Sequence, residues 1–167
     1  PANRRFLYPY INCTDCGPRY TVIERLPYDR PYTTMHMWSM CPACSAEYYD
    51  PADRRFHAQP TACPDCGPHY HVQGQDGEIH GDEKAIKKTA ELLRSGRIVA
   101  IKGLGGYLLA CDAENEEAVW ELRRRKRRGE KPFALMVKDL ETARAFIDIC
   151  AEEENLLTSS ARPIVLA

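Results

Sequence analysis

Three Cys-x-x-Cys pairs constrain the fold of this 167-residue chain more than any other feature of its sequence. Such a pair places two sulfurs on one side of a tight turn, so two pairs can close a tetrahedral site around a borderline-soft ion such as zinc. In two pairs Gly-Pro follows the second cysteine, and a glycine that tolerates positive φ lets backbone N–H groups turn toward the sulfurs. The pattern therefore predicts zinc ligands rather than disulfides or redox-active thiols. In chain order the pairs are Cys13 and Cys16, Cys41 and Cys44, and Cys63 and Cys66.

An internal repeat indicates which pairs share a metal. Residues 1–22 align without a gap on residues 51–72, and 12 of the 22 positions are identical, which gives a period of 50 residues. The third pair comes 22 positions after the second, so we expect these two pairs to form one complete site. We expect the first pair to be the second half of another module, whose first half would precede residue 1. The predicted complete site consists of Cys41, Cys44, Cys63 and Cys66.

Two other ligand sets are compatible with the spacing. The first and second pairs are separated by 24 residues and could share a metal, although the third pair would then lack partners and the repeat argues against this. His36 could complete a site with the first pair, but a single histidine is more often a surface or packing residue. The remaining histidines, His57, His69, His71 and His80, have no recognisable ligand spacing.

The overall composition favours no particular macromolecular partner. The formal net charge is −1, no stretch is apolar and long enough to span a bilayer, and the first residues lack the pattern of a signal peptide. We therefore expect a cytoplasmic protein with no membrane partner, in which paired cysteines bind metal more often than they form disulfides.

Small zinc modules often bind nucleic acid, and that alternative has to be weighed. A DNA-reading module usually presents a basic helix after its first cysteine pair, whereas residues 45–56 mix acidic and basic side chains and are interrupted by Pro51. We expect Tyr48, Tyr49 and Phe56 to form the small core that a zinc module needs, because the metal contributes most of its folding free energy. A structural zinc is thus favoured over a nucleic-acid reader.

The second half of the chain has an α/β pattern. A turn-rich linker or hairpin at residues 72–82 precedes it, and the Asn, Asp and Gly positions that follow suggest helix caps and turns. We expect Asp82 to cap the first helix and Cys111 and Cys150 to be buried free thiols. The expected elements are helices at 82–96, 115–128 and 139–150 and strands at 97–103, 106–113, 133–137 and 162–167.

Two features of this half could bind an anion. Residues 123–132, "RRRKRRGEKP", hold seven of the chain's 23 Lys and Arg residues, and guanidinium groups bind phosphate bidentately. A phosphate or nucleotide pocket and a solvated or nucleic-acid-binding run both remain open. The glycine-rich turn "KGLGGY", residues 102–107, could approach a phosphate through backbone N–H groups, but it lacks the ending of a P-loop and could be a plain turn.

The motifs in combination resemble the HypF family of carbamoyltransferases, which help to mature nickel–iron hydrogenases. The resemblance is carried by "CTDCGPRYTVIERLPYDRPYTTM", "MCPACSAEYYDPADRRFHAQPTACPDCGP", "IKGLGGYLLACDA", "RRRKRRGEKPFALMV" and "SARPIVLA". It implies an α+β or α/β fold class, with small four-cysteine zinc modules followed by a partial YrdC-like α/β domain. The expected divisions are residues 1–30 for half of a first zinc module, 31–75 for a complete one and 76–167 for the beginning of the YrdC-like domain. The family's acylphosphatase-like and Kae1-like domains would flank this segment.

The resemblance also implies a reaction. Members of the family use carbamoyl phosphate and ATP, with Mg²⁺, to form carbamoyl-adenylate, and they pass the carbamoyl group to the C-terminal cysteine of the partner HypE for cyanide ligand synthesis. Lys102 and the glycines after it stand where related tRNA-modifying enzymes carry a Thr-rich substrate loop, and the sequence departs from that pattern there. The Ser-Ala-Asn segment that completes the nucleotide site of YrdC-like domains is missing, so we expect this segment alone to be inactive. An alternative is part of a tRNA threonylcarbamoyl-adenylate synthase, a family without tandem zinc modules. The residues expected to bind the nucleotide or carbamate are Arg125, Lys126, Arg128, Lys131, Lys102 and Arg162.

Overall fold

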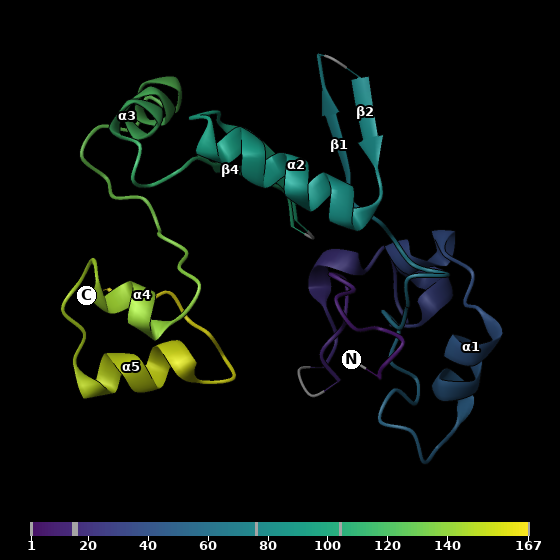
Figure 1. Ribbon diagram of the computed structural model, residues 1–167. Helices are drawn as coiled ribbons and strands as arrows, with labels where there is room; N and C mark the ends of the chain where they lie inside the picture. Colours follow the sequence, from purple (N-terminus) through teal and green to yellow (C-terminus); the bar gives the residue numbers. More distant parts are fainter. Residues whose placement is uncertain (1, 15–16, 76, 104, 167) are drawn as a thin grey trace. The chain divides into compact units, whose positions relative to one another are not determined.

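The computed structural model describes residues 2–14, 17–75, 77–103 and 105–166, and the chain divides into two compact units, Pro1–Ala118 and Val119–Ala167 (Figure 1). Helix α3, Glu116–Arg125, crosses the division, and the second unit also contains α4, Leu140–Arg144, and α5, Ala151–Thr158. The first unit contains the 3-10 turns η1, Tyr20–Val22, η2, Arg30–Tyr32, and η3, Thr34–Met37, then α1, Pro42–Tyr49, β1, His71–Gly74, β2, Gly77–His80, α2, Asp82–Arg94, β3, Val99–Lys102, and β4, Tyr107–Ala110. The predicted domain boundaries near residues 30 and 75 do not coincide with this division and remain predictions.

The 50-residue repeat extends to the backbone conformation. Leu7 and His57 occupy equivalent positions, and both have positive φ, 60° and 51°. Each is preceded by a turn in which the side-chain oxygen of Asn3 or Asp53 accepts a hydrogen bond from the backbone N–H two residues later, at 2.8 and 2.7 Å. The two copies therefore adopt the same local fold around their "RRF" segments.

The small hydrophobic core combines residues from both copies of the repeat. Tyr8 from the first copy, Ala62 from the second and Met35 from η3 are buried together, and Tyr10 and Trp38 pack against them. Tyr8 also donates a hydrogen bond from its hydroxyl to the Pro68 carbonyl at 3.0 Å. The first copy is thus packed onto the second module rather than separated from it.

The predicted aromatic core of the zinc module is only partly correct. Tyr48 on α1 is buried and donates to the Gln59 side chain at 2.7 Å. Tyr49 and Phe56, however, remain 64% and 45% exposed. Tyr49 is adjacent to Tyr48 on the helix and points to another face, and the space next to the metal ligands is filled by the first copy instead.

A hairpin links the zinc module to the α/β part. Strands β1 and β2 pair antiparallel with His71 opposite His80, so the turn-rich segment is a hairpin. The carboxylate of Asp82 accepts hydrogen bonds from the Tyr70 backbone N–H at 2.6 Å and from the His69 ring at 2.9 Å. Asp82 lies in the first turn of α2 rather than at its N-cap, which is Gly81, so the predicted cap was displaced by one residue.

The next predicted elements are confirmed with shorter bounds. Strands β3 and β4 pair antiparallel, with Val99 opposite Ala110. Helix α3 ends before the predicted residue 128 because Arg127 adopts a positive φ of 48°. The N–H groups of Arg127 and Arg128 donate to the carbonyls of Arg124 and Arg123 at 3.1 Å each, which is the Schellman pattern that satisfies a helix C-terminus.

The end of the chain differs from the predictions. Residues 133–137 and 162–166 form no strand within the described part of the chain, since a strand requires a hydrogen-bonded neighbour, and 133–137 and 162–166 have none there. The helix predicted at 139–150 spans only Leu140–Arg144, and Cys150 instead has the extended conformation of the N-cap of α5, which was not predicted. Among the residues that the structure describes, no helix has the length and apolar character needed to cross a membrane.

Candidate metal centre and basic segment

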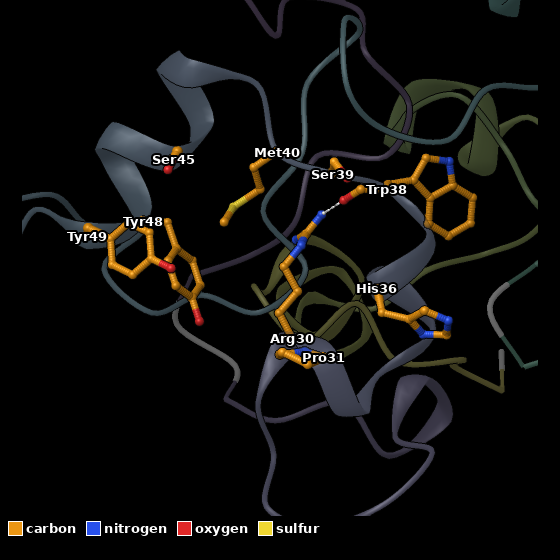
Figure 2. Close-up of a pocket in the computed structure, with 9 residues that line it drawn as sticks. All are labelled: Arg30, Pro31, His36, Trp38, Ser39, Met40, Ser45, Tyr48 and Tyr49. Carbon is orange, nitrogen blue, oxygen red and sulfur yellow. Dashed lines mark hydrogen bonds between the residues drawn. The ribbon is translucent and has the colours of Figure 1, made fainter.

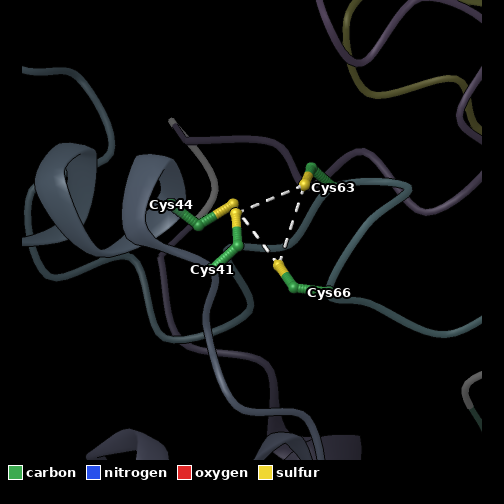
Figure 3. A group of neighbouring side chains, drawn as sticks. All are labelled: Cys41, Cys44, Cys63 and Cys66. Carbon is green, nitrogen blue, oxygen red and sulfur yellow. Dashed lines mark hydrogen bonds between the residues drawn. The ribbon is translucent and has the colours of Figure 1, made fainter.

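The second and third cysteine pairs converge on one point, where their sulfurs face one another (Figure 3). Three sulfur–sulfur distances, Cys41–Cys63, Cys63–Cys66 and Cys66–Cys44, are 3.7, 3.7 and 3.6 Å, and all four sulfurs lie within 4.8 Å of one another. A zinc–sulfur bond of about 2.3 Å gives a tetrahedron with edges of about 3.8 Å, whereas a disulfide requires about 2.0 Å. The geometry therefore fits a tetrahedral metal ion and excludes disulfides.

Two local structures hold these sulfurs. Cys41 is the N-cap of α1 and Cys44 lies one turn further along that helix. Cys63 and Cys66 lie in a turn closed by hydrogen bonds from the N–H groups of Cys66 and Gly67 to the Cys63 carbonyl, at 3.1 and 2.9 Å. Backbone hydrogen bonds of a helix and of a turn thus hold each pair in position independently of a metal ion.

Glycine at position 67 is required by lack of space and not by the positive φ that was expected. Its φ is not in the positive range, in contrast to Gly17, whose φ is 67°. A Cβ atom at Gly67 would collide with the Tyr8 hydroxyl and would lie 2.6 Å from Cβ of Ala62. Glycine is required there because the first copy packs closely against the turn.

The thiols differ in their tendency to ionise. Burial raises the pKa of Cys63 to about 12. Burial also acts to raise the pKa of Cys41, but hydrogen bonds from the Cys44 backbone N–H and from the neighbouring sulfurs outweigh it and lower that pKa to about 7. Four thiolates at this separation repel one another, so a cation is needed to ionise all of them together.

Charged side chains surround Cys44. Arg4 and Arg5 approach its sulfur to 3.3 Å, and both form ion pairs with Glu47 on the same helix. Burial acts to raise the pKa of Glu47, but the hydrogen bonds from Arg5 and Arg4 lower it to about 2. The cysteine spacing gave no indication of these contacts, although the repeated "RRF" motif marked the arginines as a shared feature of the two copies.

A second buried arginine, Arg30, organises the region beside the centre (Figure 2). Its guanidinium donates to the carbonyls of Gln59, Thr61 and Trp38 at 2.7, 2.8 and 2.7 Å. Arg30 also lines a shallow cavity of about 410 Å³ together with Tyr48. Burial lowers the pKa of Arg30, and the nearby Cys66, Tyr48 and Cys44 oppose this effect only in part.

Only one cysteine of the first pair, Cys13, belongs to the described residues. Cys13 is exposed and its carbonyl accepts a hydrogen bond from Arg19 at 2.8 Å, whereas Cys16 lies outside the described residues. The His36 Nδ1 atom lies 2.8 Å from the Thr33 carbonyl oxygen and 3.5 Å from the Glu24 carboxylate. In the described part of the chain, only the second and third pairs bring three or more potential ligands close enough for one metal ion.

The basic segment after α3 is folded around Phe133. Arg123 and Arg128 both lie over its ring, with guanidinium carbons 4.8 and 5.2 Å from the ring centroid. Arg123 donates to the carbonyls of Arg128, Gly129 and Lys131, and Arg128 donates to the carbonyls of Lys131 and Pro132. Both arginines therefore stabilise the loop. To bind a nucleotide as predicted, Arg128 would have to give up some of these contacts.

The remaining predicted binding residues are exposed. Arg125 is paired with Glu121 at 2.5 Å, and Arg124 pairs with the same carboxylate at 2.7 Å. Within the described residues, the side chains of Lys126 and Lys131 form no hydrogen bond or ion pair.

Two further predicted binding residues lie outside the basic segment. Lys102 belongs to the first unit, where its ammonium lies 5.1 Å from the ring centroid of Tyr107. Arg162, in the second unit, has a positive φ of 46°, and its guanidinium donates to the Leu157 carbonyl at 3.4 Å.

The burial predicted for the two isolated cysteines is found only in part for Cys111 and is wrong for Cys150. Cys111 is half-buried, and burial raises its pKa. Cys150 is exposed because it caps the N-terminus of α5, where the N-cap residue faces solvent.

Comparison with known proteins finds two family models that match different parts of the chain. A model described as the HypF finger matches residues 1–23 and 40–73, which contain all three cysteine pairs. A model described as Telomere recombination, for the Sua5, YciO and YrdC proteins, matches residues 91–167. The chain thus combines a zinc-finger region with part of a YrdC-like domain.

Relatives with both parts in this order are carbamoyltransferases. Carbamoyltransferase HypF2 of Cupriavidus necator is 55% identical over 166 residues, which cover 99% of this chain and 21% of that protein. The crystal structure of T. kodakarensis HypF, 57% identical, matches 98% of this chain and 21% of its own with a TM-score of 0.86. A full-length HypF in a phosphate- and nucleotide-bound form, 51% identical, matches 95% of this chain and 21% of its own with a TM-score of 0.80. The chain belongs to the HypF family and spans about a fifth of the length of these relatives.

Proposed function

We propose that the chain is the zinc-finger and nucleotide-site region of a HypF-type carbamoyltransferase. In this proposal carbamoyl phosphate is hydrolysed to carbamate and phosphate, and carbamate reacts with ATP to give carbamoyl-adenylate and pyrophosphate. The carbamoyl group then passes to the C-terminal cysteine of HypE for cyanide ligand synthesis, and AMP is released. The likeness to a full-length HypF in a phosphate- and nucleotide-bound form carries the proposal, because it extends over 95% of the chain. Flanking domains of the same polypeptide, in the cytoplasm, would supply the other steps.

The metal of this proposal is Zn²⁺, held by Cys41, Cys44, Cys63 and Cys66. When bound, the ion supplies the positive charge that keeps four thiolates together and joins α1 to the turn that follows it. Four protein sulfurs fill a tetrahedral coordination shell and leave no open position for substrate, so the role is structural. The sulfur separations of 3.6 and 3.7 Å support this assignment.

The nucleotide side of the proposal relies on exposed cations. Carbamate and the α-phosphate of ATP are both anions, so forming carbamoyl-adenylate requires positive groups that hold them together while pyrophosphate leaves, with Mg²⁺ on the ATP phosphates. Lys126 and Lys131 are available for this role, and Arg125 would exchange its Glu121 partner for phosphate. Arg128 contributes by fixing the loop, and Lys102 and Arg162 are further candidates.

A chimera tests this function. The corresponding segment of T. kodakarensis HypF, to which this chain is 57% identical, is replaced by the chain. We expect the chimera to convert ATP to AMP and pyrophosphate only when carbamoyl phosphate is present, and then to carbamoylate HypE. A chimera that also carries Lys126→Ala and Lys131→Ala should be slower by roughly tenfold or more. A folded, zinc-loaded chimera without AMP formation would contradict the function, and equal activity of the lysine variant would contradict the site.

A further inference from the structure

The metal centre of the second repeat copy receives hydrogen-bond donors from the first copy. Arg4 directs both of its terminal nitrogens at Sγ of Cys44, each at 3.3 Å. Arg5 directs a third nitrogen at the same sulfur, also at 3.3 Å. A further nitrogen–sulfur distance, from Arg4 to Cys41, is 3.9 Å. Two cations about 40 residues away in sequence therefore lie against one ligand of the centre.

Other contacts fix these guanidinium groups in place. Glu47 lies three residues after Cys44 on α1, and its Oε2 is 2.9 Å from Arg4 and 2.5 Å from Arg5. The Arg5 Nε atom donates to the Ala62 carbonyl at 2.7 Å, next to the third cysteine pair. Arg5 is only 1% exposed. It thus joins the two local structures that hold the four sulfurs.

The repeat provides an internal comparison. Arg54 is the equivalent of Arg4 in the second copy, and its side chain is exposed. Within the described part of the chain, the Arg54 side chain forms no hydrogen bond or ion pair, unlike Arg4. The same residue in the same local fold therefore contacts the metal centre in one copy only.

We propose that Arg4 and Arg5 are positioning residues of the metal centre, and that they stabilise its metal-loaded state by hydrogen-bonding to the Cys44 thiolate. This proposal rests on the proposed zinc site. A divalent ion bound to four thiolates leaves two net negative charges. Two adjacent guanidinium groups, which share the Glu47 carboxylate, offset part of that charge in a partly buried setting. Because the same groups fix the first copy on α1, metal loading of the second module and docking of the first copy favour each other.

Zinc affinity of matched variants tests the proposal. Arg4→Gln is compared with Arg54→Gln in the full chain, by competition with a chromogenic zinc chelator, in a background where Cys13→Ser and Cys16→Ser limit the metal to the centre described above. We expect Arg4→Gln to weaken zinc binding by roughly 10- to 100-fold and Arg54→Gln to leave it unchanged. Arg4→Lys keeps the charge but offers fewer directed donors, so it should fall between the two.

The possible results distinguish the role of Arg4 from the existence of the zinc site. Equal zinc affinity of the two glutamine variants would overturn the role of Arg4 while leaving the zinc site intact. If the reference protein, with only Cys13→Ser and Cys16→Ser, binds no zinc, the site itself is overturned and this inference with it. Should Arg4→Gln fail to fold by circular dichroism, the comparison of Arg4→Lys with Arg54→Lys gives the same decision, and equal affinities would again refute the proposal. The tetrahedral absorption bands of Co²⁺ in the same variants provide a second readout that does not depend on the chelator.

Discussion

Replacing Arg30 by methionine tests whether a buried guanidinium holds the metal module together. The substitution keeps an unbranched side chain but removes the donors to the carbonyls of Trp38, Gln59 and Thr61, which lie 2.7–2.8 Å away. Thr61 is fully buried and Gln59 is 4% exposed, so their carbonyls have little access to water. The variant therefore leaves three acceptors without their donors.

The magnitude follows from these three contacts. A buried acceptor without a partner costs about 1–3 kcal/mol. The cavity lined by Arg30 is open, so water can reach part of the site and the lower end of that range applies, at about 1–1.5 kcal/mol for each carbonyl. We expect the free energy of unfolding to fall by about 3–4.5 kcal/mol, which is a large part of the 5–15 kcal/mol typical of a domain.

Urea denaturation of the zinc-loaded protein measures this loss. Trp38 reports on the module, and Trp120→Phe removes the fluorescence of the other tryptophan. Arg54→Met serves as the matched control, because Arg54 is exposed, and it should change the stability by no more than about 0.5 kcal/mol. If Arg30→Met and Arg54→Met unfold at the same urea concentration, the reasoning from buried carbonyls is refuted.

Three further results are expected. Cys63→Ser should lower the zinc content by about one ion per chain relative to Cys111→Ser, measured by metal analysis, and unchanged content would contradict the ligand set. Gly67→Ala should destabilise the module by about 1–3 kcal/mol in thermal unfolding because its methyl group meets a buried tyrosine, whereas Gly74→Ala enters open space, so similar melting would argue against the packing described. The folded pKa of Glu47 is about 2 and its unfolded value about 4.3, so its ionised form stabilises the fold above about pH 4.3 and this contribution is lost as the pH falls toward 2. The stability difference between wild type and Glu47→Gln should shrink over that interval, and a difference independent of pH would refute the ion pairs.

The elements that sequence predicted well are those fixed by local chemistry. Helix α2 has strong helix formers followed by Gly96, whose φ is 75°, and strands β3 and β4 are joined by a glycine-rich turn. The four-cysteine site could be predicted from the cysteine spacing and the repeat, since both can be read directly from the sequence. These features depend on neighbours close in sequence.

The errors arose where distant parts of the chain decide the structure. Residues 133–137 read as a strand by composition, but pairing requires a partner that the described residues do not provide. Phe56 was expected in the core but is exposed, whereas Tyr8 from the other copy is buried in the core. Burial of Arg5 and Arg30 could not be foreseen, because arginines are ordinarily exposed and most of their carbonyl and carboxylate partners lie 29 to 57 residues away.

X-ray absorption at the zinc edge tests the central claim most directly. The sample is the zinc-loaded chain with Cys13→Ser and Cys16→Ser, so that the signal comes from the centre formed by the second and third pairs. The account predicts four sulfur ligands at about 2.3 Å and no nitrogen or oxygen ligand. A mixed ligand shell, or a chain that retains its fold without binding zinc, would contradict it.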